Sequence, residues 1–173
     1  MKRHERFIWA ADLLDVKPSD YILEVGCGVG FAVEEIARRL TSGGIVAIDK
    51  SVVMITKAAE RNEDSVRAGK VRLIKTSLAH LEEPDKSFNK IFCFNINLFW
   101  TNKHISNEAT VIKSLLKKNG SLHFFYGPMV ASGLHKTHGP VIENLEKENF
   151  KVVEIIYERK LNCCCFVAQL WSS

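Results

Sequence analysis

The chain has 173 residues, of which 46% are hydrophobic, 25% charged and 9% aromatic. This composition is typical of a folded globular protein and excludes a disordered chain. The length suits a single domain over residues 1–173, because a division into two would leave each half without a sufficient core. The formal net charge of +4 at pH 7 comes from basic residues scattered along the sequence, which disfavours nucleic-acid binding without excluding it.

The sequence contains five cysteines and no apolar run of the roughly 18 residues that a membrane-spanning helix needs. We therefore expect a cytoplasmic protein that does not enter the membrane, present as a monomer or homodimer. Cys163, Cys164 and Cys165 are consecutive. Because neighbouring residues of a strand point to opposite faces, we expect them to be small buried side chains rather than metal ligands, and we expect no metal site.

In the first half of the chain, apolar runs of strand length alternate with segments in which apolar residues recur at helical spacing. In chain order, the pattern predicts a helix over Arg6–Leu14, a strand over Tyr21–Val25, a helix over Phe31–Leu40, a strand over Ile45–Ile48, a helix from the N-cap Ser51 to Arg67 and a strand over Val71–Lys75.

The second half continues the alternation and then ends differently. The pattern predicts a helical turn over Leu78–Leu81, a strand over Lys90–Phe94, a helix over His104–Leu116 that stops at Asn119-Gly120, a strand over Ser121–Tyr126, a loop and helix over Leu134–Glu148, and two strands over Lys151–Tyr157 and Asn162–Leu170. The short charged turn between the last two strands predicts an antiparallel hairpin. The whole pattern indicates an α/β fold, a mostly parallel sheet covered by helices on both faces.

A glycine-rich turn follows the first predicted strand and opens a helix. Gly26 and Gly28 lack a Cβ atom, so the backbone can turn tightly there and approach a ligand closely. The backbone amides at such a turn receive the polar or anionic end of a ligand. Phe31 stands where the last glycine of a dinucleotide fingerprint would be, which argues against a nicotinamide oxidoreductase.

Asp49 closes the second predicted strand, roughly twenty residues after the glycine turn. A carboxylate at this place can accept hydrogen bonds from both hydroxyl groups of a ribose. The turn, this carboxylate and the terminal hairpin together favour an adenosyl ligand other than a dinucleotide.

These residues carry a resemblance that covers nearly the whole chain. Ile22–Gly30, Val46–Ser51, Ser87–Ile91 and Leu115–Leu122 resemble four successive motifs of the class I S-adenosylmethionine-dependent methyltransferases, in particular the small-molecule, methyltransferase-domain type. The resemblance implies a doubly wound, Rossmann-like sheet of seven strands in the order 3-2-1-4-5-7-6, with strand 7 antiparallel. It also implies S-adenosylmethionine as cofactor and methyl transfer to an acceptor, which we expect to be a small molecule.

The resemblance also implies a set of cofactor-binding residues. They are Glu24, Gly26, Cys27, Gly28, Gly30, Asp49, Lys50, Ser51, Ser77, Leu78 and Asn95. Asp49 would bind the ribose, Glu24 would bind the methionine end or orient the turn, and Asn95 would lie against the methionine end. Ser77 departs from the family, which usually has an acidic residue there for the adenine amino group; a hydroxyl accepts a weaker hydrogen bond than a carboxylate.

No catalytic residue is assigned from the sequence. Transfer from a sulfonium proceeds by direct displacement, so alignment and exclusion of water can lower the barrier without a general base. Phe99, Trp100, Tyr126 and Trp9 are candidates for the wall of an acceptor pocket or, equally, for core aromatics; His135 and His138 are candidates for a base or for solvated loop residues. Two other functions stay open: a non-catalytic module that binds S-adenosylmethionine or S-adenosylhomocysteine, and a methyltransferase acting on RNA or protein.

Overall fold

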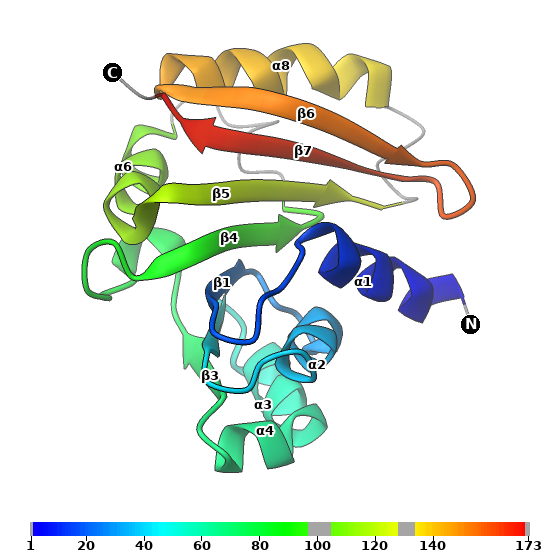
Figure 1. Cartoon of the computed structure of the whole chain (residues 1–173), viewed down its shortest axis with the longest axis vertical. Helices are drawn as coiled ribbons and strands as arrows, with labels where there is room; N and C mark the ends of the chain where they lie inside the picture. The colour runs from blue at the N-terminus through cyan, green and yellow to red at the C-terminus, as the bar shows by residue number, and fades with distance from the viewer. Residues whose placement is uncertain (1, 97–104, 128–133, 172–173) are drawn as a thin grey trace.

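The computed structural model describes residues 2–96, 105–127 and 134–171 (Figure 1). Within these residues, seven strands form one sheet in the order β3-β2-β1-β4-β5-β7-β6. The strands are β1 Tyr21–Val25, β2 Gly44–Asp49, β3 Val71–Lys75, β4 Phe88–Phe94, β5 Leu116–Tyr126, β6 Phe150–Glu158 and β7 Cys163–Leu170. β7 runs antiparallel to both β5 and β6, whereas the other neighbours are parallel. The predicted fold class and strand order are confirmed.

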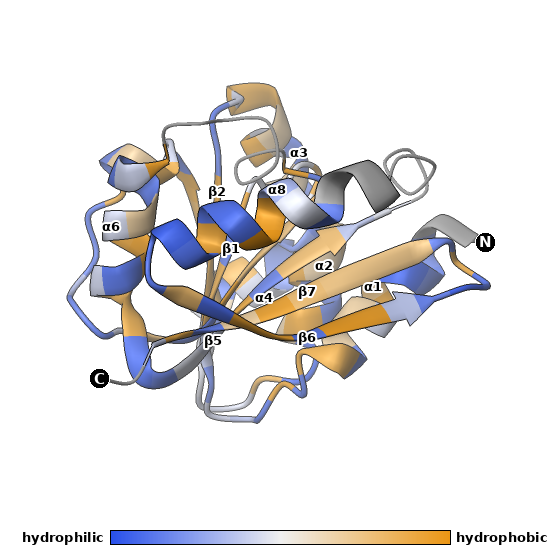
Figure 2. Cartoon of the chain, turned by 90° about the horizontal axis from the view of Figure 1, so that it is seen from above, coloured by the Kyte–Doolittle hydropathy of each residue, from blue (hydrophilic) through white to orange (hydrophobic). Residues whose placement is uncertain are grey.

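Helices cover both faces of the sheet (Figures 1 and 2). They are α1 Lys2–Leu13, α2 Phe31–Ala37, α3 Val52–Arg61, α4 Glu63–Arg67, the 3₁₀ turn η1 Leu78–His80, α6 Ser106–Leu115 and α8 Leu134–Lys147. Buried side chains of α1, α2 and α3 form one core cluster with the sheet, and those of η1, α6 and α8 form the other. This two-sided burial explains the nearly continuous apolar runs of β1, β2 and β4.

The three consecutive cysteines lie in β7, and all are free and buried. Cys164 belongs to the core cluster beneath α6 and α8, whereas Cys165 belongs to the cluster beneath α1 and α2. The strand therefore directs neighbouring thiols to opposite faces of the sheet, and the prediction that they are small buried side chains is confirmed.

The helix predicted from Ser51 to Arg67 is wrong as one continuous element, because it breaks at Asn62 into α3 and α4. The buried side-chain amide of Asn62 donates to the carbonyl oxygen of Ala58 at 2.8 Å and to that of Gly30 at 3.2 Å. Asn62 itself has a non-helical backbone (φ −110°, ψ 22°). A contact with a residue 32 positions away thus ends a helix whose local pattern would continue.

The predicted start of the fifth strand at Ser121 is also wrong. β5 begins at Leu116, so the expected stop at Asn119-Gly120 lies inside the strand. Leu116 is fully buried and pairs with Phe88, which extends β4 as well, and the register shifts between Phe88 and Lys90. A Cβ atom added to Gly120 would lie 3.0 Å from the carbonyl oxygen of Asn89, so glycine here permits close strand packing rather than a turn.

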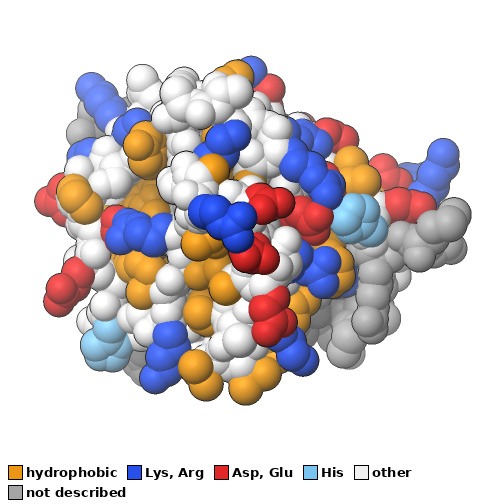
Figure 3. Space-filling model, turned by 90° about the horizontal axis from the view of Figure 1, so that it is seen from below, with side chains coloured by type: hydrophobic (Ala, Val, Ile, Leu, Met, Phe, Trp, Pro, Cys, Tyr) orange, Lys and Arg blue, Asp and Glu red, His pale blue; other side chains and the backbone are white. Residues whose placement is uncertain are grey.

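Charged side chains of both signs are mixed on the face drawn in Figure 3. Elsewhere in the described structure, too, opposite charges lie together: Arg67 pairs with Glu63, and Arg72 pairs with Glu83. This mixing agrees with the scattered distribution of basic residues in the sequence and does not form the single-sign patch typical of nucleic-acid binders on that face. Among the described residues, no helix is long and apolar enough to cross a membrane.

Substitution of Gly30 by alanine should destabilise the fold more than the same substitution at Gly69. Both glycines have left-handed backbones (φ +77° and +73°), so both variants suffer strain of about 1–2 kcal/mol. A Cβ at Gly30 would also lie 2.7 Å from the Asn62 amide nitrogen and 3.0 Å from Ala58 Cβ, whereas one at Gly69 meets nothing within 4 Å. We expect Gly30→Ala to cost about 1–3 kcal/mol more in urea unfolding; equal losses would contradict this packing argument.

Candidate functional site

The glycine turn is held against the end of β2 by backbone hydrogen bonds. The amides of Gly26 and Cys27 both donate to the carbonyl oxygen of Ile48, at 2.8 and 3.0 Å. Gly26, Gly28 and Gly30 all have positive φ angles, between +54° and +77°. This left-handed backbone strongly favours glycine, which explains the spacing of the motif.

Asp49 is the last residue of β2, and its carboxylate connects the turn to the next helix. One oxygen, Oδ2, accepts the amide of Gly28 at 3.0 Å, and Oδ1 accepts the amide of Ser51 at 2.9 Å. The Ser51 hydroxyl in turn accepts the amide of Met54 at 3.4 Å, which confirms Ser51 as the N-cap of α3. A carboxylate can accept about four hydrogen bonds, so Asp49 retains capacity for further donors.

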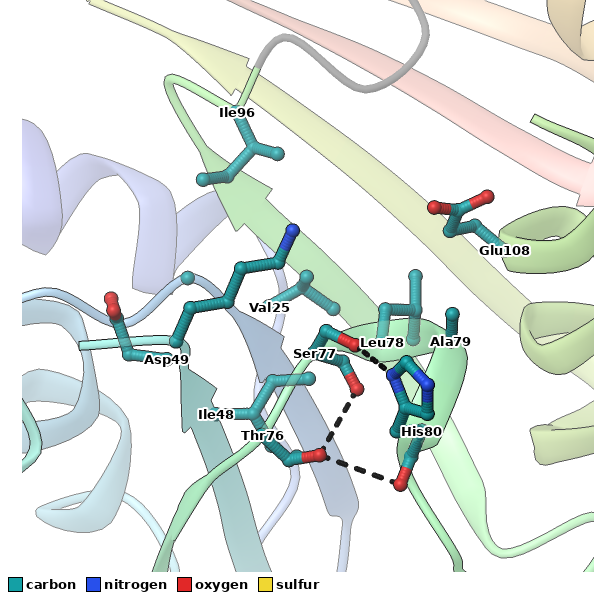
Figure 4. Close-up of a pocket in the computed structure, with 12 residues that line it drawn as sticks. Val25, Ile48, Asp49, Thr76, Ser77, Leu78, Ala79, His80, Ile96 and Glu108 are labelled. Carbon is teal, nitrogen blue, oxygen red and sulfur yellow. Dashed lines mark hydrogen bonds between the residues drawn. The ribbon is translucent and has the colours of Figure 1, made fainter. Parts of the chain in front are cut away.

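A cavity of about 440 Å³ opens beside Asp49 at the carboxyl ends of β1, β2 and β3 (Figure 4). This volume is within the range of roughly 300–1,000 Å³ that is typical of small-molecule sites. Its lining residues are Val25, Gly26, Ile48, Asp49, Lys50, Thr76, Ser77, Leu78, Ala79, His80, Ile96 and Glu108. The carboxyl edge of a parallel sheet, where such loops meet, is where ligands bind in this class of fold.

Five of the predicted cofactor-binding residues line this cavity: Gly26, Asp49, Lys50, Ser77 and Leu78. Three more predicted residues hold the wall of the cavity in place: the amide of Cys27 donates to Ile48, and the amides of Gly28 and Ser51 donate to Asp49. Gly30, at the start of α2, packs against Ala58 and Asn62. The cofactor contacts of all these residues stay predictions.

Asn95 joins the ends of two strands, and its contact with the cofactor stays a prediction. The side-chain oxygen of Asn95 accepts a hydrogen bond from the backbone amide of Gly127 at 2.6 Å. The backbone amide of Asn95 donates to the carbonyl oxygen of Phe125 at 2.8 Å. With its positive φ of +55°, Asn95 therefore fastens the end of β4 to the end of β5, and it does not line the cavity. The next residue, Ile96, does line the cavity.

Glu24 lies under the turn, on β1, and only 2% of its surface is exposed. Burial, together with the negative charge of Asp49, raises the pKa of its carboxyl well above the usual range. Its Oε2 atom has no hydrogen-bond partner among the described residues. A buried carboxyl with an unpaired oxygen is costly to the fold, which points to a donor supplied by a ligand.

The aromatic candidates for an acceptor pocket separate into two groups. Tyr126 is fully buried against Phe166 and belongs to the core. Trp9 is half-buried and packs edge-on against Phe125 of the core, with ring centroids 5.5 Å apart. Phe99 and Trp100 lie outside the described residues.

Of the two candidate bases, His138 lies in α8 rather than in a loop. Its ring contacts the hydroxyl of Tyr157 at 3.1 Å and packs edge-on against Phe166. The side chain of His135 lies outside the described residues. No group of His, Cys, Asp and Glu that could hold a metal ion occurs among the side chains that the structure describes.

Sequence reasoning missed Val25, Ile48, Thr76, Ala79, His80, Ile96 and Glu108 as lining residues. Most of them directly flank a predicted site residue, so the ends of the strands were a usable signal. Glu108 had none, because it reaches the cavity from α6, which packs against η1.

The sequence model of the methyltransferase-domain family matches residues 22–120, from β1 into β5. The chain belongs to the methyltransferase-domain family. The predicted membership of the S-adenosylmethionine-dependent methyltransferases is therefore confirmed.

Individual relatives agree with this assignment. The putative methyltransferase YrhH of Bacillus subtilis (strain 168) is 23% identical over 157 residues, which cover 91% of this chain and 82% of that protein. Cycloartenol-C-24-methyltransferase 1 of Oryza sativa subsp. japonica is 29% identical over 92 residues, 53% of this chain and 26% of that protein. The matched part thus spans only about a quarter of the plant enzyme.

Among solved structures, magnesium protoporphyrin IX methyltransferase from Synechocystis PCC 6803 with bound S-adenosylmethionine superposes with a TM-score of 0.74 at 14% identity. The superposition covers 98% of this chain and 80% of that one, and it shows a shared fold.

The residues at the cavity fit the cofactor of this family. Asp49, which lines the cavity, has remaining capacity to accept hydroxyl groups. Glu24 does not line the cavity, but its unpaired oxygen lies on β1 just before the turn, as an acceptor for an ammonium group. A Cβ atom added to Gly28 would meet nothing within 4 Å, so there is open space beside the turn for a ligand to approach the backbone.

Substitution of Glu24 by glutamine should remove a pH dependence of stability. Below its ordinary pKa of about 4.5, Glu24 is protonated in both the folded and the unfolded protein. Above this pH the unfolded chain loses the proton first, because the folded pKa is raised. The free energy of unfolding therefore falls as the pH rises toward the folded pKa. Because glutamine does not ionise, we expect Glu24→Gln to be more stable than the wild type by about 1–3 kcal/mol at pH 8 and by much less at pH 4.5.

Urea unfolding at the two pH values measures this difference. The matched control is Glu60→Gln, at an exposed glutamate of α3, which should track the wild type at both. A Glu24→Gln variant that also tracks the wild type would contradict the burial argument.

Proposed function

We propose that this protein transfers a methyl group from S-adenosylmethionine to a small-molecule acceptor, as a single domain. The observation that carries the proposal is the meeting of the glycine turn with the Asp49 carboxylate at one cavity on the carboxyl edge of the sheet. Membership of the methyltransferase-domain family supports the reaction type.

Each part of the site has a role in this proposal. Asp49 accepts the ribose hydroxyls through the lone pairs that Gly28 and Ser51 leave free, and the closely packed Gly26 brings the backbone near the ligand. Glu24 receives the ammonium of the methionine end, directly or through water. The cofactor supplies an activated methyl group; the chain contributes its alignment and the exclusion of water by the apolar residues of the cavity.

The relatives support an acceptor that is a small, largely apolar molecule. One relative is named for cycloartenol and one structural neighbour for magnesium protoporphyrin IX. The mixed charges on the surface drawn in Figure 3 give less support to an RNA acceptor.

Replacing Asp49 by asparagine should weaken binding of S-adenosylhomocysteine, the cofactor's product, by about 1.5–3 kcal/mol, because charged acceptors of hydrogen bonds contribute about that much. Titration calorimetry measures the affinity. Asp64→Asn changes the charge equally at a carboxylate that is 99% exposed and does not line the cavity, and should bind as the wild type does. Absence of binding by the wild type at millimolar ligand would refute the proposed function.

Methyl transfer itself is tested by incubating the protein with S-adenosylmethionine labelled in the methyl group and with fractions of a cell extract. The proposal expects label in the small-molecule fraction, and label in protein or RNA instead would redirect it to a macromolecular acceptor. Tight binding without any transfer would identify a non-catalytic binding module.

A further inference from the structure

The further inference rests on the proposed function and concerns the adenine end of the cavity. Asp49 occupies one side of the cavity, and Thr76, Ser77 and His80 lie where β3 leads into η1 (Figure 4). Ile48, Leu78 and Ala79 line the same region with apolar surface. The faces of a purine bound beside Asp49 would contact these apolar side chains. Its polar edge would then meet the hydroxyl of Thr76 or Ser77.

The Thr76 hydroxyl is already committed to the turn. Its oxygen lies 3.3 Å from the carbonyl oxygen of Ser77 and 3.4 Å from that of His80, so its single proton is shared between these two acceptors. Thr76 thereby holds η1 closed on the end of β3 (Figure 4). The Ser77 hydroxyl differs in that its partner is a side chain and not the backbone of the turn.

The Ser77 hydroxyl has a close partner in His80. Ser77 Oγ and His80 Nδ1 lie 2.7 Å apart, a short distance for a hydrogen bond that involves a nitrogen. When neutral, the imidazole has one acceptor nitrogen, and with its proton on Nε2 that acceptor is Nδ1. The serine proton then points at His80, and the lone pairs of Oγ are directed away from it. A hydroxyl that donates in this way is also a stronger acceptor, because the bonds polarise each other.

We propose that Ser77 and His80 act as a pair that reads the exocyclic amino group of adenine. His80 accepts the serine proton, and Ser77 Oγ accepts a hydrogen bond from the adenine amino group. The resemblance implies an acidic residue at the position of Ser77, and the pair would take its place. His80 is thus a positioning residue: by accepting the serine proton, it leaves the hydroxyl, which can otherwise donate or accept, only as an acceptor.

This arrangement selects against a 6-oxo purine. Hypoxanthine carries a carbonyl oxygen where adenine carries the amino group, so it would place one acceptor against another. The site should therefore prefer S-adenosyl-L-homocysteine to S-inosyl-L-homocysteine, and that preference should depend on both members of the pair.

Glu108 is the competing acceptor, because its carboxylate lines the cavity from α6, on the side opposite Asp49 in Figure 4. The observations favour Ser77, which lies in the turn directly after β3, beside the apolar wall formed by Leu78. The experiment has to distinguish the two.

The test measures the affinities of both homocysteine ligands by calorimetry for the wild type and four variants. Ser77→Ala should lower the affinity for the adenosyl ligand about fivefold, which corresponds to one neutral hydrogen bond. The affinity of this variant for the inosyl ligand should change less than about twofold. His80→Phe should reproduce this loss. His80→Asn should retain most of the preference, because the asparagine side-chain oxygen can accept the serine proton from about the position of Nδ1. Glu108→Gln, which removes the charge of a lining residue, should leave the ratio of the two affinities unchanged.

The outcomes separate this inference from the proposed function. If Glu108→Gln abolishes the preference while Ser77→Ala keeps it, the amino group is read by Glu108 and the inference is wrong. A His80→Phe variant that keeps the full preference would overturn the role of His80. If the wild type binds both ligands equally and Asp49→Asn weakens both, the inference fails and the cofactor assignment stands. Binding of neither ligand by the wild type overturns both.

Discussion

The site depends on the carboxylate of Asp49, which receives backbone amides from two different segments. Gly28 belongs to the turn after β1, and Ser51 begins α3, the helix after β2. One side chain therefore fixes the turn, the end of β2 and the start of α3 relative to each other. The amides of Gly26 and Cys27 add two bonds to the neighbouring carbonyl of Ile48. Because these partners are backbone groups, the geometry of the turn exists before any ligand arrives, and binding does not have to order it.

This preorganisation has a cost to the fold. Glu24 and Asp49 are two carboxylates close enough for the charge of Asp49 to raise the pKa of Glu24, and Glu24 is buried with one oxygen unpaired. A protein selected only for stability would have an apolar residue at this place in β1, between Leu23 and Val25. Strain and unsatisfied groups that persist in a well-packed core are typical of binding sites. The buried carboxyl of Glu24 is therefore consistent with the binding role proposed for it.

Local patterns are sufficient to predict the order and type of the elements. Strands of a parallel sheet buried on both faces need continuous apolar runs, and the helices that cover them need one apolar face, so both are visible in the sequence. The errors arose where a distant residue decides the outcome. Asn62 ends α3 because it bonds to Gly30, and Leu116 starts β5 because it pairs with Phe88. At the site, the residues next to strand ends were within reach of sequence reasoning. Glu108 was not, since only the packing of α6 on η1 brings it to the cavity.

The two sides of the cavity are fixed by different kinds of interaction, and this difference has a consequence for specificity. Asp49 is held by backbone amides, so its position follows from the path of the chain and the register of β1 with β2. The Ser77 side is set by the hydrogen bonds that the Thr76 hydroxyl donates to backbone carbonyls and by the bond between Ser77 Oγ and His80 Nδ1. Substitution of His80 changes the partner of the Ser77 hydroxyl, whereas substitution of Thr76 also removes the bonds that hold η1 on the end of β3. If Asp49 binds the ribose and Ser77 the base, as proposed, the ribose contact follows from the path of the chain, whereas the contact with the base can be changed by substitution of His80 alone.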